Sequence, residues 1–176
     1  MTEERRIRVL FAEATIAKRN DEIASDIARR DPKNLLVIAI LKGSFMFAAD
    51  LMRALHRAGM QPQVEFMHLS SYREGTTSSG QVTILKDVES DVRDRDVVLV
   101  DDILESGRTL AFAKDLLTAR GARVITCCLL EKPGHRAVEL KADLVGFTCP
   151  DLFVVGYGMD VAHSYRQLPF IGVVES

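Results

Sequence analysis

Two stretches of this 176-residue chain are apolar at every position, and each has the length of one β-strand: Leu35–Leu41 and Val97–Val100. A strand that is apolar on both sides must be buried on both faces, as in parallel sheets that are covered by helices. Segments with helical spacing of apolar residues, Ala14–Arg30 and Phe45–Ala58, alternate with such strands. This alternation predicts an α/β fold with a central, mostly parallel sheet flanked by helices.

The alternation of strands and helices continues to the end of the chain. A turn follows Val97–Val100 and leads into a helix that runs to about Arg120, with Gly121 as its C-terminal cap. The other expected strands are Val64–Leu69, Val82–Leu85, Ala122–Leu130, Leu144–Thr148, Phe153–Val155 and Phe170–Val174. Because no repeat, low-complexity tract or proline-rich linker divides the sequence, we expect residues 1–176 to form a single domain.

The composition excludes several classes of protein. A net charge of −2, spread along the chain, favours neither a nucleic-acid nor a membrane partner. The charged start, MTEERRIRVLF, does not fit a signal peptide, and no stretch reaches the roughly 18 apolar residues of a membrane span. The three cysteines, Cys127, Cys128 and Cys149, lack the spacing of a disulfide framework or a zinc site. We therefore expect reduced, buried thiols and a cytoplasmic protein.

A polar segment rich in glycine, serine and threonine, Ser70–Gly80, lies between two of the expected strands. It is long for a connection between neighbouring strands. Two interpretations stay open: a mobile surface loop, or a lid that closes over a reacting centre and excludes water.

The polar run Asp101–Thr109 follows the apolar strand Val97–Val100 and precedes a helix. In open α/β sheets, ligands bind beyond the carboxyl ends of the strands. Backbone N–H groups of such a loop and the N-terminus of the next helix attract an anion. Gly107 allows a phosphate to approach the backbone closely, and Ser106 and Thr109 add hydroxyl donors. The run therefore predicts a phosphate site.

Asp101 and Asp102 have the wrong charge to bind a phosphate directly. They suit two vicinal ribose hydroxyls, or a Mg²⁺ that itself carries the charge of the ligand. The run Asp101–Thr109 thus predicts a diol on one side and a phosphate on the other. An acidic strand end before an ordinary helix cap is the alternative. A Walker phosphate loop is excluded, because the Gly-Lys-Ser/Thr ending is missing.

The segment VVLVDDILESGRTL, Val97–Leu110, resembles the signature of the type I phosphoribosyltransferases. Five further segments are similar to those of the hypoxanthine (hypoxanthine-guanine) phosphoribosyltransferases, in that family's order: Leu41–Phe47, Ser70–Tyr72, Leu130–Pro133, Phe153–Asp160 and Tyr165–Pro169. The resemblance extends over most of the chain. It implies the type I phosphoribosyltransferase fold, with a small hood formed by the N- and C-terminal segments and a flexible lid at about residues 70–80. Ser71 and Tyr72 match the tip of this lid.

The reaction that the resemblance implies is transfer of the phosphoribosyl group of phosphoribosyl pyrophosphate (PRPP) to N9 of a purine, with release of pyrophosphate. By the same resemblance, Mg²⁺ is the cofactor, held by Asp101, Asp102 and Asp160. The ribose lies against Asp101 and Asp102. The 5′-phosphate is bound by Ser106, Gly107, Arg108 and Thr109. The pyrophosphate is bound by Lys42, Gly43 and Arg166, with an unusual backbone turn at Leu41-Lys42.

The purine side of the implied site contains four residues, Lys132, Phe153, Val154 and Asp160. Lys132 matches a sensor of the 6-oxo group, because an ammonium donates to a carbonyl and repels an amine. It should therefore favour hypoxanthine or guanine over adenine. Phe153 is expected to stack on the ring, and Val154 to offer backbone groups to the base edge.

Glu105 is the main departure from the family pattern, which usually has Asp here as the general base or acid at purine N7. Glu keeps the carboxylate and adds one methylene, so we interpret it as the catalytic residue with a shifted geometry. His163 stands where an acidic residue is common, and we assign it no role. The other histidines, His56, His68 and His135, have no partner visible in the sequence and are expected to be structural or solvated.

Three functions remain in competition at this point. The first is an enzyme of purine salvage that makes IMP, GMP or both. The second is a phosphoribosyltransferase that prefers xanthine, since Lys132 and Phe153 would serve any 6-oxopurine. The third is a regulator that binds PRPP without catalysis, which the intact set of Lys132, Phe153, Asp160 and Arg166 disfavours. The family resemblance also implies a homodimer or homotetramer.

Overall fold

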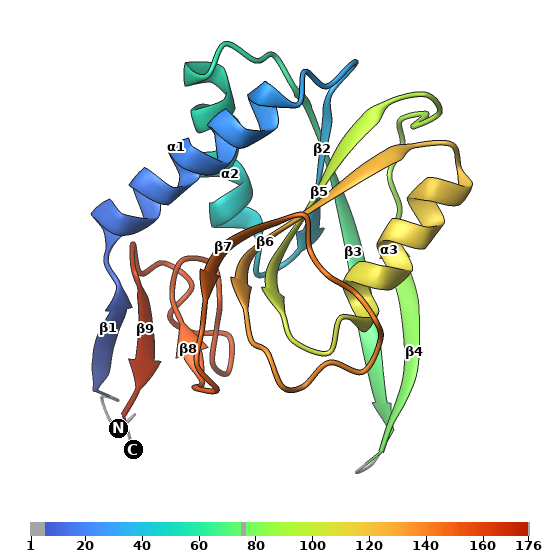
Figure 1. Ribbon diagram of the computed structural model, residues 1–176. Coiled ribbons are helices and arrows are strands. Elements are labelled where there is room, and N and C mark those ends of the chain that lie inside the picture. The colour runs from blue at the N-terminus through green and yellow to red at the C-terminus, as the bar shows by residue number, and fades with distance from the viewer. Residues whose placement is uncertain (1–5, 75–76, 176) are drawn as a thin grey trace.

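The main body of the protein is a six-stranded sheet, in a computed structural model that describes residues 6–74 and 77–175 (Figure 1). Its strand order is β4-β3-β2-β5-β6-β7, and every neighbouring pair is parallel except β3 with β4. The strands are β2 (Leu36–Leu41), β3 (Gln63–Glu74), β4 (Thr77–Lys86), β5 (Asp96–Leu104), β6 (Arg123–Glu131) and β7 (Leu144–Thr148). The predicted mostly parallel sheet is confirmed.

Three helices cover the two faces of this sheet (Figure 1). α1 (Glu13–Arg29) and α2 (Phe45–Arg57) lie on one face, and α3 (Arg108–Ala119) lies on the other. The predicted helices are therefore confirmed to within a residue or two. α3 ends where expected, because Gly121 adopts a φ of +95°, a conformation that suits glycine after a helix. None of the helices in the described part of the chain is long and apolar enough to cross a membrane.

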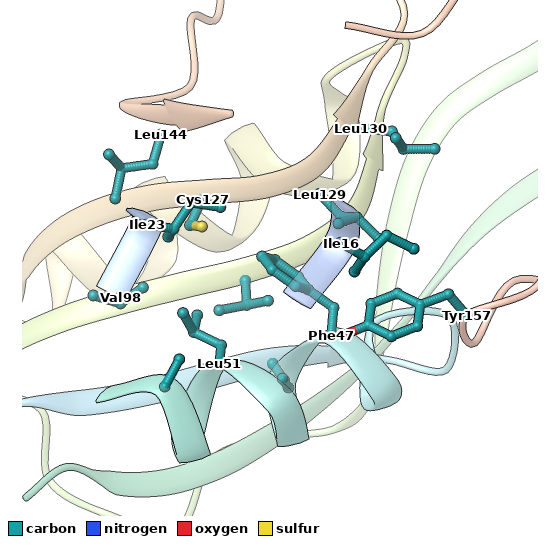
Figure 2. Close-up of a cluster of buried hydrophobic side chains, with 14 of the residues drawn as sticks. Ile16, Ile23, Phe47, Leu51, Val98, Cys127, Leu129, Leu130, Leu144 and Tyr157 are labelled. Atoms are coloured by element: carbon teal, nitrogen blue, oxygen red, sulfur yellow. The ribbon is translucent and has the colours of Figure 1, made fainter. Parts of the chain in front are cut away.

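The hydrophobic core is divided by the sheet into two clusters, as neighbouring residues of a strand point to opposite faces. Cys127 packs with the α1 and α2 side chains, including Phe47 and Leu51 (Figure 2). Cys128, the next residue of β6, packs on the other face with the α3 side chains. All three cysteines are buried and free, as predicted. Burial raises the pKa of the Cys127 thiol to about 12, so this thiol is unreactive.

A second, smaller sheet joins the two ends of the chain, in the order β1-β9-β8. Its strands are β1 (Ile7–Phe11), β8 (Val154–Val155) and β9 (Ile171–Val174), and all are antiparallel to their neighbours. Phe11 stacks on Phe147 of β7, with ring centroids 4.3 Å apart, and so ties the small sheet to the large one. These are the segments from which a hood was expected. Strand β1 was not predicted from the sequence.

The polar segment between β3 and β4 is more regular than expected. The strand predicted at Val64–Leu69 continues to Glu74, and the strand predicted at Val82–Leu85 already begins at Thr77. Together they form an antiparallel hairpin. The predicted loop was wrong for these residues, because backbone pairing needs no apolar side chains and threonine and tyrosine suit strands. Residues 75 and 76 and the side chain of Tyr72 lie outside the described part. The lid function of this hairpin stays a prediction.

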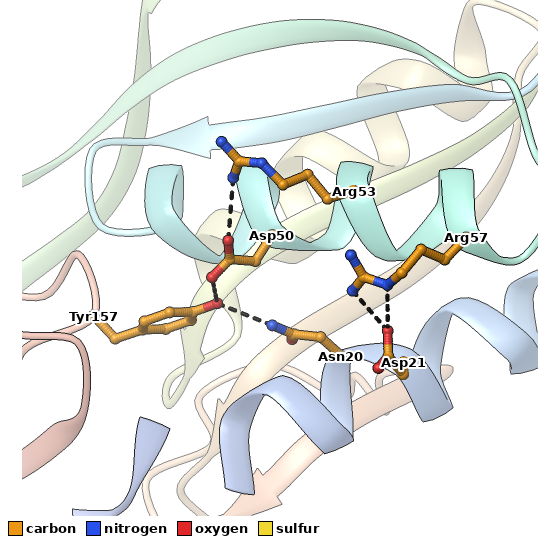
Figure 3. A network of polar contacts seen from close by, with 6 residues as sticks. All are labelled: Asn20, Asp21, Asp50, Arg53, Arg57 and Tyr157. Atoms are coloured by element: carbon orange, nitrogen blue, oxygen red, sulfur yellow. Dashed lines mark hydrogen bonds and ion pairs between the residues drawn. The ribbon is translucent and has the colours of Figure 1, made fainter. Parts of the chain in front are cut away.

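A polar network fixes the turn that follows β8 to both helices on its side of the sheet (Figure 3). The Tyr157 hydroxyl donates to Asp50 of α2 and accepts a hydrogen bond from Asn20 of α1 at 2.9 Å. Burial, and then its hydrogen bond to Asp50, raise the pKa of Tyr157 well above its usual value. The hydroxyl therefore keeps its proton and remains a donor at all physiological pH values.

Candidate active site

A cleft with two connected lobes lies at the carboxyl ends of the parallel strands β2, β5 and β6. The smaller lobe has a volume of about 230 Å³ and is lined by the end of β2 and by the segment from Asp101 to Leu110. The larger has a volume of about 560 Å³ and extends to Lys132, Phe153 and Arg166. Both are lined by Lys42, Gly43, Asp102 and Glu105. This is where an α/β sheet is expected to bind ligands.

Asp101 and Asp102 lie on a strand and not in a loop, which corrects the sequence analysis. β5 continues to Leu104, because Asp101 pairs with Cys128 and Leu104 with Glu131 across the β5–β6 ladder. Main-chain pairing does not depend on the polarity of the side chains, so the change from VVLV to DD did not end the strand. The connection to α3 is only Glu105–Gly107.

The two carboxylates form a donor set that fits a divalent cation. Asp101 is 8% exposed, and its side chain accepts a hydrogen bond from the Asp102 N–H at 2.9 Å. Burial, followed by the negative charge of Asp102, raises the pKa of Asp101 well above its usual range. A cation would relieve this repulsion, and carboxylate oxygens are the ligands that Mg²⁺ prefers. The residues present therefore fit the metal that the sequence implied.

The segment between β5 and α3 has the geometry of an anion site. Gly107 adopts a φ of +82° immediately before the first residue of α3, a conformation that a β-carbon disfavours. The N–H of Arg108 donates to the Ser106 hydroxyl at 3.3 Å. Ser106, Gly107 and Thr109 line the smaller lobe, as predicted. Arg108 lines neither lobe, and its part in binding a phosphate stays a prediction.

The turn between β2 and α2 forms the opposite wall of the cleft. The peptide bond between Leu41 and Lys42 is cis, in agreement with the unusual turn expected there. A β-carbon on Gly43 would lie 1.9 Å from Oδ2 of Asp102, so any larger residue here would force the carboxylate or the turn to move. The Ser44 hydroxyl donates to the Ile40 carbonyl at 2.6 Å and anchors the turn to its strand. The predicted pair Lys42 and Gly43 therefore lies beside the carboxylates.

The far end of the larger lobe contains the residues that were assigned to a purine. Lys132 is only 6% exposed, whereas Phe153, which precedes β8, is 59% exposed. Val154, next to it, is buried. An exposed aromatic ring beside a buried lysine in one lobe provides a stacking surface and a hydrogen-bond donor for a flat, polar ligand.

Asp160 and Arg166 also line the larger lobe and form an ion pair. The shortest nitrogen–oxygen distance between them is 3.1 Å, and the guanidinium also donates to the Gly158 carbonyl at 2.7 Å. The backbone N–H of His163 donates to Asp160 at 2.8 Å, while the His163 side chain is exposed. Ser71 lines neither lobe.

Three residues of the cleft were not recognised from the sequence: His68, Asp151 and, through its contact with Asp151, His135. His68 and Asp151 line the larger lobe. His135 is exposed, as expected for a solvated histidine, but it lies 2.9 Å from Asp151, a partner that the sequence did not show. The dipeptide Pro150-Asp151 does not by itself indicate a binding or catalytic site. The pair of His135 and Asp151 can be recognised only in the structure, where two connecting segments meet.

Comparison with known proteins agrees with this geometry. The phosphoribosyl transferase domain family matches residues 10–162. The hypoxanthine-guanine phosphoribosyltransferase of Lactococcus lactis is 42% identical over 169 residues, 96% of this chain and 91% of that protein. The hypoxanthine phosphoribosyltransferase of Escherichia coli is 40% identical over 172 residues, with 96% and 95% covered.

Solved structures give the same result. The crystal structure of a hypoxanthine-guanine phosphoribosyltransferase from Bacillus anthracis, with HEPES in its active site, superposes with a TM-score of 0.90 at 40% identity. The match covers 98% of this chain and 100% of that one. Family match, sequence identity and fold agree over nearly the whole length, and the chain therefore belongs to the hypoxanthine (hypoxanthine-guanine) phosphoribosyltransferases, a family of enzymes within the type I phosphoribosyltransferases.

Proposed function

We propose that this protein transfers the phosphoribosyl group of PRPP to N9 of hypoxanthine, guanine or both, which gives IMP or GMP and pyrophosphate in purine salvage. The observation that carries the proposal is the composition of one cleft. Paired carboxylates and the N-terminus of α3 line one lobe, and a buried lysine and an exposed aromatic ring line the other. A phosphorylated ribose and a 6-oxopurine need these two kinds of surface side by side.

The smaller lobe would hold the phosphorylated ribose. Ser106, Gly107, the N–H of Arg108 and Thr109 would bind the 5′-phosphate, and Asp101 and Asp102 would hold the ribose hydroxyls and Mg²⁺. When bound, Mg²⁺ neutralises charge on the pyrophosphate and so makes it a better leaving group. Lys42, Gly43 and Arg166 bind the pyrophosphate from the shared wall, and the planar guanidinium of Arg166 suits bidentate contact with a phosphate. Asp160 is the third proposed metal ligand.

The larger lobe would hold the purine during a displacement at C1′ of the ribose. The N9 lone pair forms the new bond to C1′, the bond from C1′ to the pyrophosphate oxygen breaks, and its electrons leave with pyrophosphate. Glu105 accepts the proton that the purine loses, at N7. Phe153 stacks on the ring, Val154 offers backbone groups to the base edge, and Lys132 donates to the 6-oxo group. Ser71 and Tyr72 belong to a hairpin that we propose closes over this centre.

Two other functions fit part of the same evidence. A preference for xanthine would use the same lysine and aromatic ring, because xanthine also has a 6-oxo group. A regulator that binds PRPP without catalysis would not need the lobe that contains Lys132, Phe153 and Glu105. The presence of that lobe favours the enzyme.

A panel of purine bases tests the proposal directly. With PRPP and Mg²⁺, the purified protein should convert hypoxanthine, guanine or both to nucleotide and largely ignore adenine. Nucleotide formation is followed by absorbance or chromatography for hypoxanthine, guanine, xanthine and adenine. Turnover of xanthine alone would support the second function, and no turnover with any 6-oxopurine would overturn the enzyme.

Lys132→Ala should weaken binding of hypoxanthine and guanine and reduce discrimination against adenine. Loss of one hydrogen bond from a charged donor costs about 1.5–3 kcal/mol, which corresponds to about a tenfold to hundredfold rise in the KM for hypoxanthine. Steady-state kinetics with each base measure the change, and Lys141→Ala, at an exposed lysine outside both lobes, is the matched control. If discrimination against adenine survived intact, Lys132 would not be the carbonyl sensor.

We also propose a homodimer or homotetramer in the cytoplasm. Two exposed apolar side chains on one face of β3, Val64 and Phe66, support contact with a second copy. The free, buried cysteines support a reducing compartment.

A further inference from the structure

Three ionisable side chains from three different connecting segments meet at the wall of the larger lobe. Glu105 follows β5, His135 follows β6, and Asp151 lies between β7 and β8. One nitrogen or oxygen atom from each lies within 4.8 Å of the other two. His135 Nε2 and Asp151 Oδ2 are 2.9 Å apart, and Glu105 and Asp151 both line the lobe. The cluster is separate from Asp101, Asp102 and Asp160.

We propose that His135 is a positioning residue for Glu105. As an imidazolium held by Asp151, it keeps the Glu105 carboxylate in place beside the purine. The inference rests on the proposed function, in which Glu105 accepts the proton of the base. No motif of the sequence and no step of the proposed mechanism assigns a role to His135.

The Glu105 side chain needs such a partner more than an aspartate would. Its backbone is fixed, because the Arg136 guanidinium donates to the Glu105 carbonyl at 3.0 Å. Its carboxylate has no hydrogen bond or ion pair with any residue of the described part. Glutamate also has one more rotatable bond than aspartate, so more freedom must be lost before the carboxylate faces N7. A cation on one side of the carboxylate reduces that freedom.

The charges around the cluster favour an imidazolium at His135. Two carboxylates this close repel each other, and a positive charge beside both stabilises the arrangement. The pKa of His135 is raised, first by its hydrogen bond to Asp151 and then by the charges of Asp151 and Glu105, while the positive charge of Lys132 opposes the shift. The guanidinium of neighbouring Arg136 contacts the backbone of Glu105 and the Glu131 side chain, the latter at 2.7 Å, and forms no ion pair with the Glu105 carboxylate.

The direction of the pH dependence follows from this raised pKa. The imidazolium persists to higher pH than in an ordinary histidine, whose pKa is about 6.5. The contribution of His135 is therefore fully present in acid and is lost as the pH rises through the raised pKa. The rate of the chemical step should decrease on the alkaline side for this reason.

Two substitutions separate the charge of His135 from its shape. His135→Gln should lower the single-turnover rate about threefold to fivefold at neutral pH, the size expected for a partly exposed charge pair. The KM for PRPP should not change, and the alkaline decrease should become shallower. His135→Arg carries a permanent charge, so it should keep most of the rate and also lose the alkaline decrease. His56→Gln, at an exposed histidine near the end of α2, is the matched control.

A double substitution tests whether His135 acts through Glu105. In a Glu105→Asp background the carboxylate is withdrawn by one methylene, so adding His135→Gln should change the rate less than twofold. An unchanged rate and pH profile in His135→Gln, or an equal loss with Asp and Glu at position 105, would overturn the inference. Failure of the proposed function has a different result: the unchanged protein would then form no nucleotide from any 6-oxopurine.

Discussion

The Glu105→Gln protein should transfer the phosphoribosyl group about a hundredfold more slowly than the unchanged protein, because a positioned general base contributes about 10² to 10⁴ in rate. Glutamine has almost the same shape but cannot accept the proton that leaves the purine. Glu105 lines the wall shared by both lobes, where the ribose and the base would meet. Single-turnover measurements with saturating PRPP isolate the chemical step from product release.

Binding of PRPP with Mg²⁺ provides the control for this substitution. Its dissociation constant, measured by calorimetry, should stay within about twofold, since Asp101, Asp102 and the N-terminus of α3 are unchanged. Glu105→Asp should retain most of the rate, because it keeps a carboxylate at the same place. Equal single-turnover rates for the glutamine variant and the unchanged protein would remove Glu105 from proton transfer.

Gly43→Ala should lower kcat/KM for PRPP about a hundredfold, because displacement of reacting groups by about 1 Å has effects of that size. The added β-carbon would lie 1.9 Å from Oδ2 of Asp102, far inside van der Waals contact. Either the Asp102 carboxylate or the Lys42-Gly43 turn must move, and both belong to the same wall of the cleft. Steady-state kinetics with varied PRPP measure the loss.

In Gly43→Ala, a loss of folding stability must be distinguished from a displacement of the cleft residues. Overpacking costs about 1–3 kcal/mol of the free energy of unfolding, which urea titration measures. Gly59→Ala is the matched control, since Gly59 has a φ of +86° and has open space around the missing β-carbon. It should be destabilised by backbone strain with unchanged kinetics. If Gly43→Ala bound and used PRPP normally, the close packing against Asp102 would have no role in the site.

The parts of the fold that could be predicted from the sequence are those with local signals. Leu35–Leu41 is a continuous apolar run and the helices show helical spacing of apolar residues. Both signals lie within one segment, so the types were correct and the bounds agreed to within a residue or two. Strand β1 carries no such signal. Arg8 interrupts the short apolar run of β1, and β9, with which β1 pairs, lies near the other end of the sequence. Only this pairing makes β1 a strand.

The candidate site, too, could be predicted only in part from the sequence. Residues within motifs, such as Asp101, Gly107 and Lys132, line the cleft as expected. His135 and Asp151 did not stand out, because each depends on a residue from another connecting segment. The extent of β5 was wrong for a related reason: whether Asp101 is in a strand is decided by its pairing with β6 and not by its own polarity.

The network of Tyr157 has a consequence for what the cleft can accept. Helix α2 begins directly after the Lys42-Gly43 turn, and its Asp50 holds the hydroxyl of Tyr157. The next residue, Gly158, lies against the carbonyl of Gly43 so closely that a β-carbon there would be 2.4 Å from it. Helix α2 thus connects the Lys42-Gly43 turn to the segment that follows β8. If these two sides of the cleft bind pyrophosphate and purine as we propose, the helix keeps the distance between the two binding positions constant.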